Sequence, residues 1–287
     1  MLNYYVSVKR GSDATGTGTA ASPWKSIAKA IGTAPSVSLG AAGARVYLEP
    51  GTYYEAVDLG LTPSATTPLE VIGDCDGAGF LAGGYADPKT GVVEWAAWDD
   101  DATVKSIPCL SHGGVRSHVT LRRIKFYGAQ RSGGGCIQMA SSTGWSLIDC
   151  SFIAHVGNNN AIQVTTPAAG LALVLDRCDV WSSGYGVVVS SAQIGDVDEP
   201  LLIIRNSRFR GGRNNSRALR IVQSGTAGQI IRNAVIESCS FLGLERGLEL
   251  ADTSTIPPTT PYQVRGCAFL HCIIGLRSGA EGIVAED

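Results

Sequence analysis

Hydrophobic and polar positions alternate in short runs that recur through the second half of the chain. Six segments share one pattern, in which an alternating apolar run leads through a polar or Gly position to a final Phe or Val: 118–126, 144–152, 172–180, 201–209, 233–241 and 261–269. Their last residues follow one another at intervals of 26, 28, 29, 32 and 28 residues. A period of roughly 20–50 residues is typical of solenoids and propellers.

Each unit predicts a strand, a bend and a second strand. Alternation places Trp145 and Leu147 on one face of the first strand. Cys150 and Phe152 form the next pair of inward residues. Cys150 follows Leu147 by three positions, an odd number, so both cannot face inward on one straight strand and a bend is required between them. The bend residues predicted in this way are Asp149, Arg177, Asn206, Ser238 and Gly266.

A third strand follows a loop of variable length in each unit. It reads small, apolar, variable, apolar in 136–139, 161–164, 186–189, 218–221, 247–250 and, cut short, 275–277. Three short strands per coil predict an all-β fold, a right-handed single-stranded parallel β-helix whose strands stack about 4.8 Å apart. Leucine-rich repeats need a Leu/Asn ladder in a shorter unit, and propeller blades need four strands in a longer one.

The register predicts two interior columns. Phe152, Phe209, Phe241 and Phe269 form one column, and Cys150, Cys178, Cys239 and Cys267 form the next. A free Cys behaves as a small buried hydrophobe, so we expect free thiols; disulfides or a metal site are the alternatives. Trp145 is expected in the core.

The N-terminal segment predicts a cap. Ser22 precedes Pro23, and Trp24, Ile27 and Ile31 have helical spacing, which predicts a short helix shielding the end of the solenoid. We expect one domain, with the cap and first coil in 1–60, the remaining coils in 61–279 and a tail in 280–287.

The loop 11–19, the pair Pro23-Trp24 and the run Pro50-Gly51-Thr52-Tyr53 resemble the start of pectate-lyase-like β-helix proteins. This resemblance implies the fold over nearly the whole chain. The superfamily includes pectate lyases, other polysaccharide lyases and hydrolases, epimerases, phage tailspikes and surface adhesins, so the fold leaves the function open.

Composition and net charge limit the kinds of partner that the protein is expected to bind. The net charge of −2 does not favour nucleic acid, and no apolar run reaches membrane-spanning length. Met1 leads directly into the first predicted strand without a signal-peptide pattern, which favours a virion released by lysis.

Four groups of residues could carry chemistry. The outward column Asp176, Arg205, Glu237 and Arg265 alternates in sign, which is typical of a structural ion-pair ladder. In a calcium-dependent lyase, such carboxylates would hold the ion and an Arg would remove the proton.

The other three groups concern binding. One group is an Arg-rich stretch with Arg208, Arg210, Arg213 and Arg217. Its guanidinium groups fit the carboxylates or sulfates of a glycan, or an acidic neighbouring subunit. The alternative is that this stretch is a solvated loop without a ligand. The candidates for stacking on sugars are Trp95, Trp98 and Trp181. Asp74 and Asp76 could belong to a calcium loop, but the EF-hand pattern is incomplete and the sequence favours a β-turn for them.

We therefore expect a non-enzymatic phage virion protein, a tail, baseplate or capsid-surface component without a cofactor. It would present one face to an acidic glycan, to other virion subunits or to copies of itself, and its C-terminal end would dock on another protein. The alternative is a polysaccharide lyase or glycoside hydrolase acting on an acidic polysaccharide, with calcium in the lyase case. A bacterial surface adhesin is the second alternative.

Overall fold

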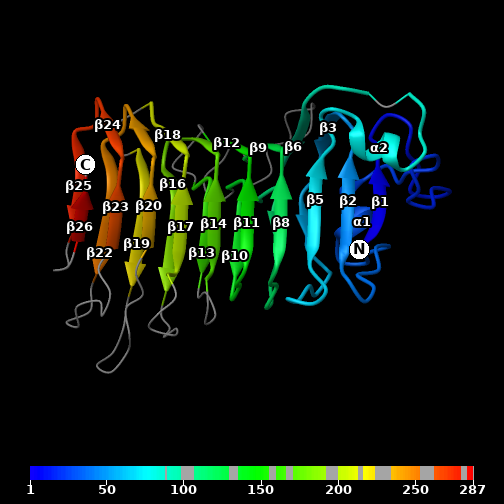
Figure 1. Cartoon of the computed structure of the whole chain (residues 1–287), viewed down its shortest axis with the longest axis horizontal. Coiled ribbons are helices and arrows are strands. Elements are labelled where there is room, and N and C mark those ends of the chain that lie inside the picture. The colour runs from blue at the N-terminus through cyan, green and yellow to red at the C-terminus, as the bar shows by residue number, and fades with distance from the viewer. Residues whose placement is uncertain are drawn as a thin grey trace.

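The chain winds into three parallel β-sheets whose strands stack coil on coil along one axis (Figure 1). A computed structural model describes residues 1–87, 89–97, 107–128, 135–154, 160–165, 171–191, 200–212, 216–223, 234–252, 262–278 and 283–286. The predicted right-handed parallel β-helix is confirmed, and the two helices, α1 (Ile27–Ile31) and α2 (Ala78–Ala82), are short. Within the described part of the chain, neither helix could span a membrane.

From β2 to β25 the strands pass through sheets A, B and C in turn, so each of these coils gives one strand to each sheet, and β1 and β26 add the outer strands of sheet A. Sheet A consists of β1 (Leu2–Val6), β2 (Ala44–Leu48), β5 (Leu69–Gly73), β8 (Val119–Arg122), β11 (Trp145–Ile148), β14 (Leu173–Asp176), β17 (Leu202–Arg205), β20 (Ala234–Glu237), β23 (Tyr262–Arg265) and β26 (Ile283–Glu286). Sheet B consists of β3 (Gly51–Tyr54), β6 (Val93–Ala96), β9 (Lys125–Tyr127), β12 (Ser151–Ala154), β15 (Asp179–Ser182), β18 (Arg208–Arg210), β21 (Ser240–Leu242) and β24 (Ala268–Leu270). Sheet C consists of β4 (Val57–Asp58), β7 (Leu110–Ser111), β10 (Ile137–Ala140), β13 (Ile162–Thr165), β16 (Tyr185–Ser191), β19 (Arg217–Gln223), β22 (Arg246–Asp252) and β25 (Ile274–Ser278).

The bend between sheets A and B is a single residue in the left-handed region. All five predicted bend residues adopt it, with φ between 51° at Asn206 and 55° at Gly266. Arg123 occupies the same position one coil earlier, with φ 54°. Polar residues tolerate this conformation better than β-branched ones do, and this bend turns the chain from one sheet into the next.

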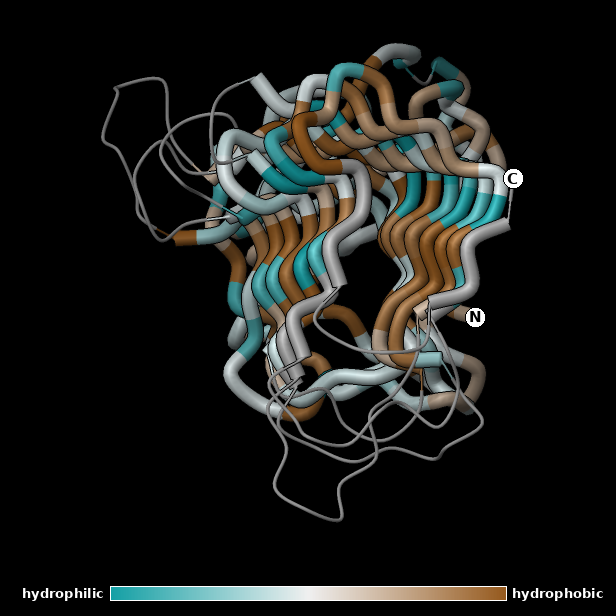
Figure 2. The backbone as a smooth tube through the Cα atoms, turned by 90° about the vertical axis from the view of Figure 1, so that its left-hand side faces the viewer, coloured by the Kyte–Doolittle hydropathy of each residue, from teal (hydrophilic) through white to brown (hydrophobic). Residues whose placement is uncertain are grey.

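Residues of like hydropathy follow one another from coil to coil, as the bands of equal colour along the backbone in Figure 2 show. The predicted Phe column is confirmed: Phe209 stacks on Phe241 at 5.3 Å between ring centroids, and Phe241 on Phe269 at 4.7 Å. Phe126 and Phe152 stack at 5.2 Å in the same column. Trp145 is fully buried, also as predicted.

The Cys column is likewise confirmed. All eight Cys are free, and Cys150, Cys178 and Cys239 are buried, whereas Cys267 is half-buried near the C-terminal end. The Sγ atoms face backbone carbonyls, as from Cys178 to Leu147 O at 3.2 Å. These thiols fill space inside the coils without cross-linking them.

The N-terminal segment differs from prediction in detail. Helix α1 begins after Ser26, whose side chain accepts a hydrogen bond from the Lys29 N–H, and not after Ser22. Trp24 instead forms an isolated bridge to Val6 and is buried. Ile27 and Ile31 face the core as predicted; that α1 shields the end of the solenoid stays a prediction.

The C-terminal segment was expected to be a tail, but residues 283–286 form β26, which pairs in parallel with β23 of sheet A. Ile283 and Val284 are β-branched, and such residues favour strands, so this segment can continue the sheet. The solenoid therefore extends to the last described residues.

Candidate functional site

Three neighbouring strands of sheet C bring together an arginine cluster, which we define as Tyr185, Arg217, Arg220, Arg246 and Glu249. The register places Tyr185 beside Arg217, and Arg217 beside Arg246. It also places Arg220 beside Glu249. Adjacent strands lie about 4.8 Å apart, so three guanidinium groups crowd onto a small area of the outer face.

The Glu249 carboxylate bridges the three arginines of the cluster. Its side chain is only 9% exposed. Its carboxylate accepts hydrogen bonds from Arg217 Nη1 at 2.7 Å and from Arg246 Nη1 at 2.6 Å. Arg220 Nε lies 3.9 Å away, within ion-pair range but beyond a hydrogen bond. One carboxylate is thus shared among three cations.

Tyr185 forms the N-terminal edge of the cluster. Its hydroxyl accepts hydrogen bonds from Arg217 and from Arg220 Nη1, the latter at 3.1 Å. Both guanidinium groups also lie over its ring, at 5.0 and 5.3 Å from the centroid. The phenol therefore orients two of the three arginines.

The cluster has unused capacity for an anion. The Nε atoms of Arg217, Arg220 and Arg246 are buried and lack a hydrogen-bond partner. Glu245 adds a second carboxylate, 3.5 Å from Arg246 Nε, so among the described residues three positive charges face two negative ones. The buried Nε atoms are closed to solvent, and an anion would meet the accessible part of the cluster at Arg220, whose side chain is 36% exposed.

The same outward column continues toward the N-terminus with amides. Gln163 pairs in register with Val188, the neighbour of Arg220, and Gln138 pairs with Gln163. Gln138 is exposed and Gln163 half-exposed. An amide both donates and accepts hydrogen bonds, so this face offers neutral polar groups next to the cationic ones.

The Arg-rich stretch is divided between two faces. Arg217 belongs to the arginine cluster, but Arg208 and Arg210 lie on sheet B, where Asp179 accepts from their Nε atoms at 3.2 and 3.1 Å. Trp181 lies beside them, 40% exposed, with the Arg210 guanidinium 5.6 Å from its ring centroid. Arg213 and Trp98 lie outside the described residues.

The prediction that Trp95 stacks on a sugar was wrong. Trp95 is fully buried, because its strand places it in the Phe column, between Tyr53 and Phe126. Its ring centroid lies 5.5 Å from that of Phe126. Trp95 is therefore a core residue and cannot stack on a sugar.

Asp74 and Asp76 lie in a turn, the role that the sequence favoured over a calcium loop. Both Asp74 oxygens accept backbone hydrogen bonds at the start of α2, from Gly79 N and Phe80 N at 2.8 Å each. Asp76 accepts from Ala78 N and pairs with Arg123 at 2.9 Å. These carboxylates cap a turn, and the described residues contain no group of three or more His, Cys, Asp or Glu that could hold a metal ion.

The predicted charge ladder on sheet A forms ion pairs. Asp176 is buried. Its carboxylate forms ion pairs with Arg205 at 3.3 Å and Arg177 at 2.8 Å, and it accepts a hydrogen bond from Asn206 at 3.1 Å. Burial raises the pKa of Asp176, but these hydrogen bonds and charges together bring it below its ordinary value. Arg265 pairs with Glu237 at 3.8 Å. A structural role for the ladder stays a prediction.

Sequence reasoning missed Tyr185, Arg220, Arg246 and Glu249 as site residues. Arg220 and Glu249 occupy the variable position of the third strand, where Gln138 and Gln163 also stand. Charged and amide residues at one outward position of a solenoid were the signal that could have identified this face.

The comparisons with known proteins concern the fold. No protein-family model and no curated protein sequence matches the chain. The solved structure of pectate lyase Pel9A is similar at a TM-score of 0.54 and 11% identity, over 100% of this chain and 76% of that one. The complex of XylC with xylose is similar at 0.53 and 10% identity, over 93% and 66%. These likenesses show that the chain shares the parallel β-helix fold of these two structures.

Proposed function

We propose that this protein binds an acidic polysaccharide on the outer face of sheet C, through the arginine cluster, and does not cleave it. The observation that carries the proposal is the excess, among the described residues, of three guanidinium groups over two carboxylates, with the Arg220 side chain 36% exposed on the outer face. Arg matches carboxylate and sulfate with two parallel hydrogen bonds, which favours anionic sugars over neutral ones.

The geometry of the solenoid supports a chain-like ligand. Outward residues repeat every coil, about 4.8 Å apart, so a sugar chain lying along the axis could meet Gln138, Gln163 and, across the coil of the buried Val188, Arg220. Pel9A is by name a lyase of pectate, and the XylC structure holds xylose. These descriptions apply to those proteins, but they support a carbohydrate ligand for the same fold here.

The test is a binding titration against polygalacturonate, alginate and heparin, with dextran as a neutral control. Wild-type protein should bind at least one acidic polymer and not dextran. Arg220→Gln should weaken binding at least tenfold, whereas Arg208→Gln, a matched change on sheet B, should leave it unchanged. Equal binding to dextran, or no effect of Arg220→Gln, would contradict the proposal.

A lyase is the second candidate, because one observation favours it. Two guanidinium groups donate to the Tyr185 hydroxyl, so this oxygen lies beside cations that could hold a uronate carboxylate and could take the proton next to it. In such a reaction the base takes the proton from the carbon beside the uronate carboxylate, a C=C double bond forms as the glycosidic C–O bond breaks, and the leaving sugar oxygen takes up a proton from water. Ultraviolet absorbance of unsaturated ends, lost in Tyr185→Phe, would establish this candidate and exclude the non-catalytic one.

We propose a virion surface, as part of a tail, baseplate or capsid, as the place where this binding operates. Exposed apolar side chains on the last coils support docking on a neighbouring subunit: Leu242, Leu270 and Ile273 are 36%, 53% and 74% exposed. Immunolabelling of intact virions tests the location, and sedimentation of wild type against Leu270→Asp tests the docking. Unlabelled virions, or a monomer for both proteins, would contradict this setting.

A further inference from the structure

A groove of about 540 Å³ lies on a different face, between α2 and the outer side of the first strands of sheet A. Its floor is formed by Tyr47 and Ile72, which are register neighbours on β2 and β5. Ala78 and Ala82 of α2 line one wall, and charged side chains line the rest: Arg45, Glu70, Arg122, Arg123 and Asp149. An apolar floor with a few charged groups at the rim is typical of a small-molecule site.

The charges at the rim are paired with one exception. Arg45 pairs with Glu70 at 2.6 Å, Arg123 with Asp76 at 2.9 Å, and Arg177 donates to Asp149 at 2.6 and 3.0 Å. The Arg122 side chain forms no hydrogen bond or ion pair with any described residue.

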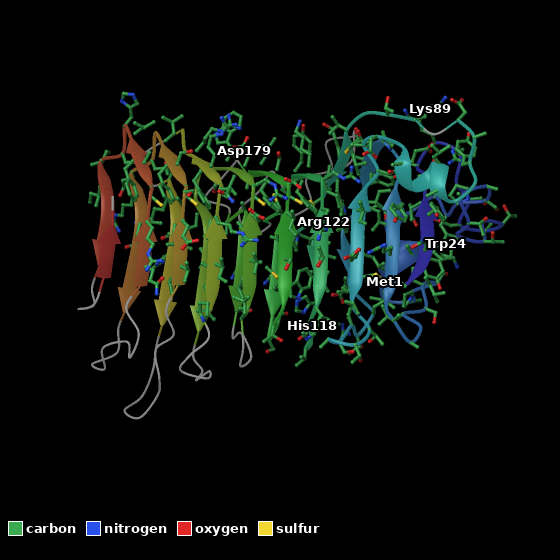
Figure 3. The ribbon with its side chains drawn as sticks, in the orientation of Figure 1. Met1, Trp24, Lys89, His118, Arg122 and Asp179 are labelled. Atoms are coloured by element: carbon green, nitrogen blue, oxygen red, sulfur yellow. The ribbon has the colours of Figure 1, made fainter. Side chains whose placement is uncertain are left out.

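The reason lies in the register of its column. Arg122 stands between Ile72 and Ile148, whereas Arg205 and Arg265 in the same column have Asp176 and Glu237 beside them. Arg122 is half-buried on β8, on the outer face of sheet A (Figure 3). A half-buried cation flanked by two apolar side chains lacks a counter-charge that its neighbours in the ladder possess.

Tyr47 gives the floor a fixed shape. Its ring stacks on Tyr5 at 5.4 Å between centroids. It also lies so close to Gly79 of α2 that a Cβ there would come within 2.2 Å of a ring carbon. The ring is therefore held between the sheet and the helix.

We propose that this groove is a second binding site, for a small organic carboxylate whose ring lies on Tyr47 and Ile72 and whose carboxylate pairs with Arg122. The apolar floor takes the body of the ligand, and the unpaired guanidinium takes its charge. This site does not depend on the function proposed for sheet C, because the two sites share no residue and lie on different sheets.

The test uses glucuronate as the probe, and glucose as the same ring without the carboxylate. Calorimetric titrations at low salt are made in the Arg220→Gln background, which weakens the arginine cluster. Glucuronate should bind at least tenfold more tightly than glucose. Arg122→Gln should reduce glucuronate binding to the level of glucose, and Arg265→Gln, a change in the same column outside the groove, should have no effect.

A second variant tests the groove without touching the charge. Gly79→Ala should displace the Tyr47 ring and weaken glucuronate binding, while the thermal midpoint shows that the protein is folded. If Arg122→Gln, folded as wild type, binds glucuronate as well as its parent, the groove is not the site. If glucuronate binds only when Arg220 is intact, it binds at the arginine cluster, and the second site is excluded while the first stands.

Discussion

Arg217 and Arg246 occupy the same register position on adjacent strands of sheet C, and the carboxylate of Glu249 accepts a hydrogen bond from each of them. Two like charges side by side would destabilise the pairing of β19 with β22. The shared carboxylate offsets this repulsion, so the cluster that we assign to ligand binding also depends on Glu249 for its stability.

Glu249→Gln should therefore destabilise the protein by about 3 kcal/mol, because it leaves two partly buried guanidinium groups without their counter-charge. Urea unfolding at low salt measures the change. Glu237→Gln, which removes an exposed carboxylate of the ladder, should cost about 0–1 kcal/mol. Equal effects of the two substitutions would show that Glu249 does not organise the cluster.

Removing one ring of the Phe column should leave a cavity. Phe241 is fully buried between Phe209 and Phe269, so Phe241→Ala should cost about 3–5 kcal/mol. Leu242→Ala, the next residue on the same strand but outward-facing, should change the free energy of unfolding far less. A near-neutral effect of Phe241→Ala would contradict the stacking.

His112 should make stability depend on pH. Burial lowers its pKa; the hydrogen bond from Nδ1 to the Gly114 carbonyl opposes this shift, and the charge of Arg116 adds to it. In the unfolded chain, His112 gains a proton below about pH 6.5, whereas the folded protein resists protonation. The unfolded state then binds more protons, so stability should fall as the pH drops from about 7 toward the lowered pKa.

Urea midpoints between pH 8 and 5 measure this dependence. His112→Gln should flatten the curve in that range, and His271→Asn, a change at an exposed site, should leave the wild-type slope. An unchanged slope in His112→Gln would assign the pH dependence to other groups.

The thiols should react in two classes. Cys75, Cys267 and Cys272 are half-buried, whereas the other five are buried, and burial raises the pKa of Cys150 to about 12. A thiol reagent should label at most the three half-buried Cys in the native state and all eight after denaturation. Fewer than eight thiols in the denatured, unreduced protein would reveal a disulfide and contradict the free column.

The repeat predicted the fold because each interior position recurs with the same parity. Asp149, Arg177, Asn206 and Ser238 could be identified as bends from the spacing between Leu147 and Cys150 and its equivalents. Trp95 could not be placed in this way, because its coil lies outside the six recognisable repeats. The position of Trp95 in the Phe column follows only from the pairing of β6 with β3 and β9.

The arginine cluster was hidden for a different reason. Tyr185 and Arg217 are 32 residues apart, whereas Arg217 and Arg246 are 29 apart, because the loops between strands of sheet C vary in length. Adjacent side chains in a parallel sheet are fixed by register, and register across unequal loops is visible only in the folded chain. The sequence therefore showed Arg217 in an Arg-rich stretch but not its proximity to Arg246 and Glu249.

The central claim is that the arginine cluster binds an acidic polysaccharide. The most direct measurement is the dissociation constant of a defined oligogalacturonate for wild-type protein, Arg220→Gln and Arg208→Gln in one buffer at low salt. The account predicts at least tenfold weaker binding for Arg220→Gln and an unchanged value for Arg208→Gln. Equal dissociation constants for all three folded proteins would contradict it.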